Sequence, residues 1–126
     1  MAIVNIESCF ERFDDTFSPK IVGELNGQHV KLARFQGEFV WHAHEEADEL
    51  FLVVRGSLEM MFRDRSETVG EGEFIIVPRG VEHCPRADDE VEVLRLRETH
   101  AKLQGRAFVG DTLAAEAIVS SVLVDG

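Results

Sequence analysis

The chain has 126 residues, of which 44% are hydrophobic, and a formal net charge of −11. This length and composition fit one globular domain, expected over residues 1–126, and exclude a disordered chain. The acidic charge argues against nucleic acid and anionic membranes as partners, since both attract basic surfaces. No apolar run reaches the roughly 20 residues of a membrane helix.

The N-terminus, MAIVNIESCF, has no basic stretch followed by an apolar one, so no signal peptide is expected. The two cysteines, Cys9 and Cys84, are too few for a disulfide scaffold. A cytoplasmic location follows as the expectation.

The first predicted element is a short helix at about residues 5–13, with Asn5 as its N-cap. Four apolar residues share one face of this helix: Ile6, Cys9, Phe10 and Phe13. The Ser-Pro step at residues 18–19 then breaks the chain. We expect the helix to pack on the outside of a sheet.

Short β-strands are predicted from residue 20 to about residue 98, which we expect to be the barrel core. The Asn26-Gly27 pair is a strong hairpin signal between the first two. The expected strands cover residues 20–25, 29–35, 39–44, 48–54, 57–63, 67–70, 73–78 and 90–98. No helix of crossover length separates them, which favours an all-β, antiparallel sandwich or barrel.

Two of these strands, at residues 50–54 and 74–77, are apolar on both faces. One face can fill the barrel, but the other must meet a second sheet, the terminal segments or another subunit. We expect a homodimer.

The C-terminal tail, about residues 100–126, has mixed signals. Asp111 could cap a helix that runs through Ala117, whereas AIVSSVLV has strand propensity. We predict a helix that turns into an extended tail.

His42 and His44 are the first candidates for chemistry. On a strand, residues i and i+2 point to the same face, with Cα atoms roughly 6.6 Å apart. Two such imidazoles can converge on one metal ion at about 2.1 Å. Taken alone, the pair is better explained by two half-exposed histidines.

Glu49 and His83 are the next candidates. Glu49 begins an apolar strand, expected beside His44, where a carboxylate needs a partner unless it lies exposed at the rim. His83 follows three residues after Gly80, where the chain re-enters the barrel. By itself it would be read as a structural histidine.

The joint spacing of these residues resembles the cupin superfamily, over about residues 37–97. The first motif consists of His42, His44, Glu49 and Gly56. The second consists of Gly72, Pro78, Gly80 and His83. The short stretch between the motifs is similar to that of small single-domain cupins.

Two positions depart from the family pattern. Gly37 lies five residues before His42, where the family usually has six, and Ala87 stands where it often has asparagine. Neither position is a ligand, so the departures concern local loop geometry.

The resemblance implies a β-barrel of two antiparallel sheets with a metal inside, held by His42, His44, Glu49 and His83. Such a ligand set suits Fe, Mn, Co, Ni, Cu or Zn and leaves about two positions open on an octahedral ion. It implies an oxygenase or isomerase acting on a small organic molecule. The alternative is a non-catalytic small-molecule or metal-binding module.

Two further features bear on the site. The chain contains no tyrosine, which argues against lyase mechanisms that use a tyrosine base. Arg95 and Arg97 alternate with Leu94 and Leu96, so one of these pairs faces inward. If the arginines face inward, the cavity has an anchor for an anion.

His29 and His100 lack matching neighbours and are interpreted as surface or packing residues.

Overall fold

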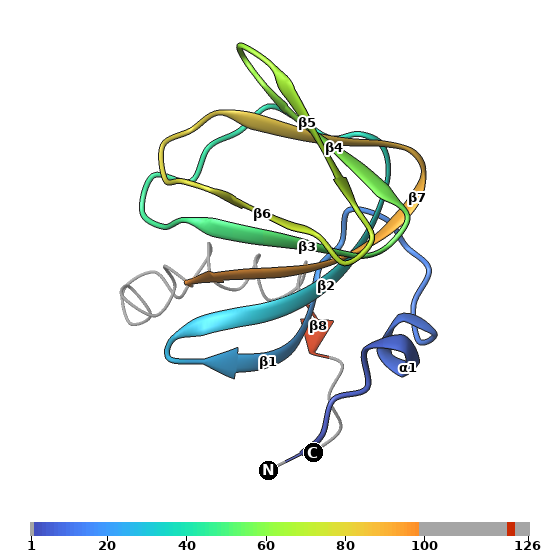
Figure 1. Ribbon diagram of the computed structural model, residues 1–126. Helices are drawn as coiled ribbons and strands as arrows, with labels where there is room; N and C mark the ends of the chain where they lie inside the picture. The colour runs from blue at the N-terminus through green and yellow to red at the C-terminus, as the bar shows by residue number, and fades with distance from the viewer. Residues whose placement is uncertain (1, 99–120, 123–126) are drawn as a thin grey trace.

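The structure, a computed structural model, describes residues 2–98 and 121–122, which form one short helix and eight strands (Figure 1). The elements are α1 (Ile6–Phe10), β1 (Lys20–Leu25), β2 (Gln28–Glu38), β3 (Glu49–Arg55), β4 (Ser57–Phe62), β5 (Ser66–Gly70), β6 (Phe74–Val77), β7 (His83–Glu98) and β8 (Ser121–Val122). Apart from β8, which is parallel to β1, every described pairing is antiparallel. The predicted all-β fold with an N-terminal helix is confirmed.

The strand β7 organises the sheet. One edge of β7 pairs with β2 along nearly its whole length. Its other edge pairs first with β4, from His83 to Arg86, and then with β3, from Glu92 to Arg97. The sheet therefore rolls into a barrel around β7 and β2 (Figure 1).

Two glycine-dependent turns shape this sheet. The β1–β2 hairpin turns at Asn26 and Gly27, whose φ angles of 51° and 81° fit the predicted two-residue turn. Gly56 has a φ of 101° at the point where the chain passes from β3 to β4. A Cβ atom there would lie 3.2 Å from the carbonyl oxygen of Glu90, so a larger residue would disturb both strands.

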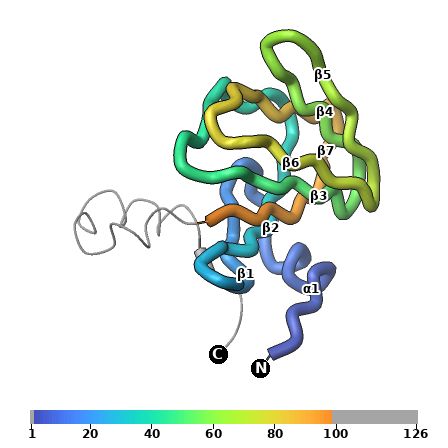
Figure 2. The backbone as a smooth tube through the Cα atoms, turned by 60° about the vertical axis from the view of Figure 1, so that its left-hand side comes forward, coloured from blue at the N-terminus to red at the C-terminus, as the bar shows by residue number. Residues whose placement is uncertain are grey.

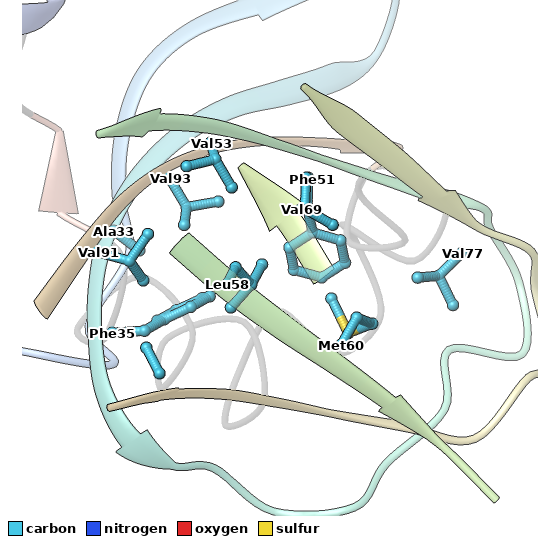
Figure 3. Close-up of a cluster of buried hydrophobic side chains, with 11 residues drawn as sticks. Ala33, Phe35, Phe51, Val53, Leu58, Met60, Val69, Val77, Val91 and Val93 are labelled. Atoms are coloured by element: carbon cyan, nitrogen blue, oxygen red, sulfur yellow. The ribbon is translucent and has the colours of Figure 1, made fainter. Parts of the chain in front are cut away.

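The main hydrophobic core lies inside the barrel, where its side chains point toward one another (Figure 3). It consists of Ala33, Phe35, Phe51, Val53, Leu58, Met60, Val69, Val77, Ala87, Val91 and Val93. Because side chains alternate along a strand, Arg95 and Arg97 lie on the same face of β7 as Val91 and Val93. The arginines, and not the leucines between them, therefore face the interior.

The strand predicted at residues 39–44 is wrong, because only His42 forms a bridge, to His83. The Phe39 amide donates to the carbonyl of Pro85, and the next bonds join His42 to His83. The first segment advances three residues, from Phe39 to His42, while its partner advances only two, from Pro85 to His83. The first segment therefore holds one extra residue, which interrupts the ladder of hydrogen bonds. A β-bulge already begins before Gly37, whose φ is 88°.

The helix α1 packs outside the barrel, as predicted (Figure 2). Its N-cap is Asn5, whose side-chain oxygen accepts a hydrogen bond from the Ser8 amide at 2.8 Å. A second apolar cluster joins the helix to the sheet and consists of Cys9, Phe10, Val22 and Leu32. The helix ends at Phe10, within the range expected from the sequence.

Arg34 fastens the segment after this helix to the barrel. Its guanidinium donates to the carbonyl oxygens of Phe10 and Phe13, at 2.7 and 3.1 Å. It also pairs with Glu90 at 2.7 Å and Glu92 at 3.0 Å. One largely buried arginine thus satisfies the open end of the helix and two strand carboxylates.

The outer face of β3 and β6 is apolar. Phe74 and Ile76 are 59% and 53% exposed, and Leu50 and Leu52 beside them are half-buried. The helix expected between Asp111 and Ala117 lies outside the described residues. None of the described helices has the length and apolar character of a membrane span.

Replacing Arg34 by lysine should destabilise the protein by about 2 kcal/mol, because one ammonium cannot reach two carbonyls and two carboxylates. Chemical denaturation monitored by circular dichroism measures this change. The matched control is Arg65→Lys, since the carboxylates that pair with Arg65 are exposed and lysine keeps its charge beside them and over the Phe62 ring, so the midpoint should stay unchanged. Equal effects of the two substitutions would contradict the role given to Arg34.

Candidate metal centre

Backbone hydrogen bonds bring the two predicted histidine segments together. The amide of His42 donates to the carbonyl of His83 at 3.0 Å, and the amide of His83 donates back at 2.9 Å. The carbonyl of His44 accepts from the Gly80 amide at 2.8 Å. The segment after β2 is therefore held against the start of β7 without being a regular strand.

The turn at Pro78–Gly80 completes this scaffold. Gly80 has a φ of 79°, which favours glycine, and this conformation accompanies its bond to His44. On the other side of the turn, the side chain of Asp48 accepts a hydrogen bond from the Arg79 amide at 2.8 Å. The second sequence motif thus supports the residues of the first.

The imidazoles of His42, His44 and His83, here called the three-imidazole group, converge inside the barrel. One ring nitrogen from each lies within 4.8 Å of the others. The ring centroids of His42 and His83 are 4.3 Å apart, and those of His42 and His44 are 5.0 Å apart. His83 is only 1% exposed. These are the spacings of residues that can share one ion.

Backbone carbonyls orient two of the rings. Nδ1 of His42 lies 2.9 Å from the carbonyl oxygen of Val40, and Nδ1 of His83 lies 2.8 Å from that of Val81. A carbonyl can only accept, so Nδ1 carries the proton and donates. In the neutral ring, Nε2 is then left with its lone pair, which is the form that binds a metal.

Among the candidate ligands, three buried polar atoms have no hydrogen-bond partner within the described residues: Nε2 of His44, Nε2 of His83 and Oε1 of Glu49. Nε of the neighbouring Arg97 also lacks one. Such atoms are costly to bury unless something satisfies them. Each of the three ligand atoms can donate an electron pair, Nε2 of His44 in the tautomer that carries its proton on Nδ1. Nitrogen and carboxylate oxygen are common ligands of divalent transition metals. The residues present therefore fit the metal that the sequence resemblance implies.

Glu49 lies beside the three-imidazole group but also belongs to an ion pair. Its Oε1 is 3.1 Å from Nε2 of His44, without the angles of a hydrogen bond. Its Oε2 accepts from Nη2 and Nε of Arg95 at 2.6 and 2.7 Å, and Arg97 lies 3.9 Å from Oε1. The assignment of Glu49 as a ligand stays a prediction.

The expected pairing of the Glu49 strand with the His44 segment is wrong. The strand β3 pairs instead with β6 and β7, where Glu49 lies opposite Val77 and Arg97. The His44 segment reaches the site from the other side, through the bridge to His83. Glu49 nevertheless approaches His44, because both side chains point into the barrel.

The charges at the site follow from burial and neighbours. Burial raises the pKa of Glu49, but the charges of Arg95 and Arg97 and the contact with His44 outweigh it and hold the pKa well below its ordinary value. Burial lowers the pKa of His42 and of His83. The site thus combines a buried carboxylate with two neutral imidazoles, those of His42 and His83, the protonation states that metal binding requires.

A small cavity of about 210 Å³ opens beside His42 and His44. Its apolar lining consists of Phe17, Pro19, Phe35, Phe39, Phe51 and Pro85. The sequence interpretation missed these residues, because apolar residues around a cavity follow the same pattern as a core. It also treated the segment with Phe17 and Pro19 as a break. His29 is not part of the group, and His100 lies outside the described residues.

The sequence model of the cupin domain family matches residues 28–96. Among curated proteins, the uncharacterized protein YdbB of Bacillus subtilis is 37% identical over 67 residues, which are 52% of this chain and 59% of YdbB. The match thus spans less than two thirds of the length of that relative.

Solved structures show the same fold. A cupin-2 domain protein from Shewanella frigidimarina has 37% identity and a TM-score of 0.76, over 77% of this chain and 95% of its own. A protein from Neisseria meningitidis has 25% identity and a TM-score of 0.72, over 78% and 100% of the two chains. The family match spans more than half of the chain and both histidine segments, and the protein therefore belongs to the cupin family.

Proposed function

We propose that the protein binds one divalent transition-metal ion through His42, His44 and His83, with Glu49 as a fourth ligand, and uses it to convert a small organic molecule. The observation that carries this proposal is the set of buried donor atoms without a partner on His44, His83 and Glu49. Together with the converging third imidazole, they need a cation to be satisfied.

The chemistry supported best is oxygenation or isomerisation. A metal held here supplies Lewis acidity and, if it is iron or manganese, redox chemistry with dioxygen. The chain's own part is to orient the rings of His42 and His83 through the carbonyls of Val40 and Val81 and to keep both rings neutral through burial. The phenylalanines give the adjoining cavity a mostly apolar lining.

A non-catalytic module that only binds a small molecule is the alternative, because this fold also serves such roles. Elemental analysis of the purified protein, followed by oxygen-consumption and isomerase assays with the metal found, separates the two. Turnover of any small molecule that needs the metal supports the enzyme. Binding without turnover supports the module.

We infer further that a second copy of the chain covers the apolar outer face of β3 and β6. Phe74 and Ile76 are more than half exposed there, next to the half-buried Leu50 and Leu52. No described strand pairs with the far edge of β6. A two-fold dimer places the same apolar face of both copies together, so one surface suffices for the contact.

Replacing His83 by alanine should abolish metal uptake, because the most buried imidazole of the group is lost. The matched control is His29→Ala, which removes an imidazole on β2 that is not part of the group and should leave uptake unchanged. Elemental analysis after dialysis measures both. Glu49→Gln should weaken binding by about 10- to 100-fold, as expected for a ligand or its closest support. Full metal content in His83→Ala would contradict the proposed site.

Protonation of His42 and His83 should weaken metal binding only below pH 6.5, the ordinary pKa of histidine. Burial lowers the pKa of His42 and His83, so both stay neutral at that pH, and protons compete with the metal only at lower values. Glu49 stays ionised, since its pKa is also lowered. Titration with Zn²⁺ between about pH 7.5 and 5 gives the Kd at each pH. A steep loss of affinity that begins above pH 6.5 would show imidazoles with ordinary or raised pKa values.

The protein should elute from size-exclusion chromatography at twice the mass of one chain. Ile76→Glu should shift it to the mass of a single chain, because the substitution buries a charge in the apolar contact. Thr68→Glu is the control, since Thr68 is exposed on β5, and it should leave the elution volume unchanged. A wild-type protein that elutes as a single chain at micromolar concentration would contradict the dimer.

A further inference from the structure

The geometry points to a single-ring aromatic carboxylate as the ligand of the cavity beside the three-imidazole group, with Phe17 setting the upper limit on its size. This inference rests on the proposed function, because it names the ligand class of the same site. It is carried by the volume of the cavity, the arrangement of its rings, its local charge and the backbone of Phe17.

The volume admits one ring. The cavity measures about 210 Å³. A cavity of about 150 Å³ in a protein core accepts benzene, and pockets for larger organic ligands measure about 300–1,000 Å³. A six-membered ring with one small substituent therefore fits, whereas two fused rings with a carboxylate do not.

The rings along the cavity favour a flat ligand. Phe17 stacks on Phe35 with centroids 5.1 Å apart and an interplanar angle of 16°. It stacks on Phe39 at 4.9 Å and 15°. Three nearly parallel rings thus line the space, and Phe51 contributes to its lining as well. Offset stacking against such faces stabilises a planar aromatic ring more than a puckered aliphatic one.

The polar end of the cavity favours an anion. It is lined by His42, His44 and Arg95. Arg95 and Arg97 both approach the single carboxylate of Glu49, which leaves one positive charge in excess among these three groups. A bound divalent metal adds to this excess. A carboxylate oxygen suits both a metal and a guanidinium, so we expect the carboxylate at this end and the ring among the phenylalanines.

The backbone of Phe17 shows that its position is enforced. Its φ is 54°, a region that bulky residues rarely adopt, and its amide donates to the carbonyl of Arg34 at 2.7 Å. Among the described residues, the other non-glycine residue with positive φ is Asn26, in a hairpin turn that requires it. Phe17 also precedes residues 28–96, the region shared with the family. The family model therefore does not cover this ring.

The test is isothermal titration calorimetry of the protein loaded with Zn²⁺, using acetate, benzoate and 2-naphthoate. Benzoate should bind at least about tenfold more tightly than either of the others, a ratio that a small difference in apolar fit can produce. Acetate leaves the aromatic space empty, and 2-naphthoate exceeds it. The metal content of each sample is measured first by elemental analysis.

Phe17→Ala should reverse the order, with 2-naphthoate gaining about tenfold over benzoate, because the end of the cavity opens. Phe17→Asn is a second variant whose residue tolerates the positive φ, and it should act in the same direction even if the alanine variant folds poorly. Phe13→Ala is the matched control. It removes a ring from the same segment, but Phe13 packs in the outer cluster, so the wild-type order should persist.

The two proposals fail in different ways. A wild-type protein that takes up no Zn²⁺ contradicts the proposed function, and the ranking of the three carboxylates in the metal-free protein then decides the inference alone. A protein that holds Zn²⁺ but binds the three carboxylates equally, or none of them, overturns the inference and leaves the metal site standing. An unchanged order in both Phe17 variants overturns the role of Phe17.

Discussion

The reciprocal backbone hydrogen bonds between His42 and His83 are the constraint on which the site depends. They join two segments that are 41 residues apart in the chain and place two imidazoles on one side of the barrel wall. The remaining contacts build on this bridge. The Gly80 amide of the Pro78–Gly80 turn donates a hydrogen bond to the carbonyl of His44. The carbonyls of Val40 and Val81 fix the orientation of the His42 and His83 rings. A strained bridge or a shifted register here would separate the three rings without changing any of them.

The barrel stabilises the His42–His83 hydrogen bonds because the strand β7 runs through both halves of the barrel. Its first residues pair with β4 beside the histidine segment, and its last residues pair with β3, which carries Glu49. The candidate ligands are thus attached to one continuous strand or to its direct neighbours. Glu49 and Arg95 share a buried ion pair in this frame, and breaking either half would leave an uncompensated charge inside the barrel.

Much of this arrangement could be predicted from local sequence signals. Asn26-Gly27 predicted the hairpin because a two-residue turn needs positive φ at both positions, and few other residue pairs adopt that conformation readily. The joint spacing of both motifs predicted that His42, His44 and His83 would meet. The strand at 39–44 was a wrong prediction, since one extra residue opposite Pro85 cannot be seen without the partner strand. The inward direction of Arg95 and the place of Phe17 depend on register and on a backbone conformation, and neither leaves a pattern in the sequence.

Arg34 contacts two parts of the molecule that have different roles, the end of α1 and the wall of the cavity. Its side chain fastens the end of α1 to the barrel, while its carbonyl holds the amide of Phe17, whose ring lines the cavity. The N-terminal segment thus forms part of the cavity wall, and Arg34 of β2 is one of the residues that hold it there. During divergence, changes in residues 2–19 could reshape what the cavity accepts while both histidine motifs stayed intact. Ligand choice and metal retention can then evolve on separate stretches of the same chain.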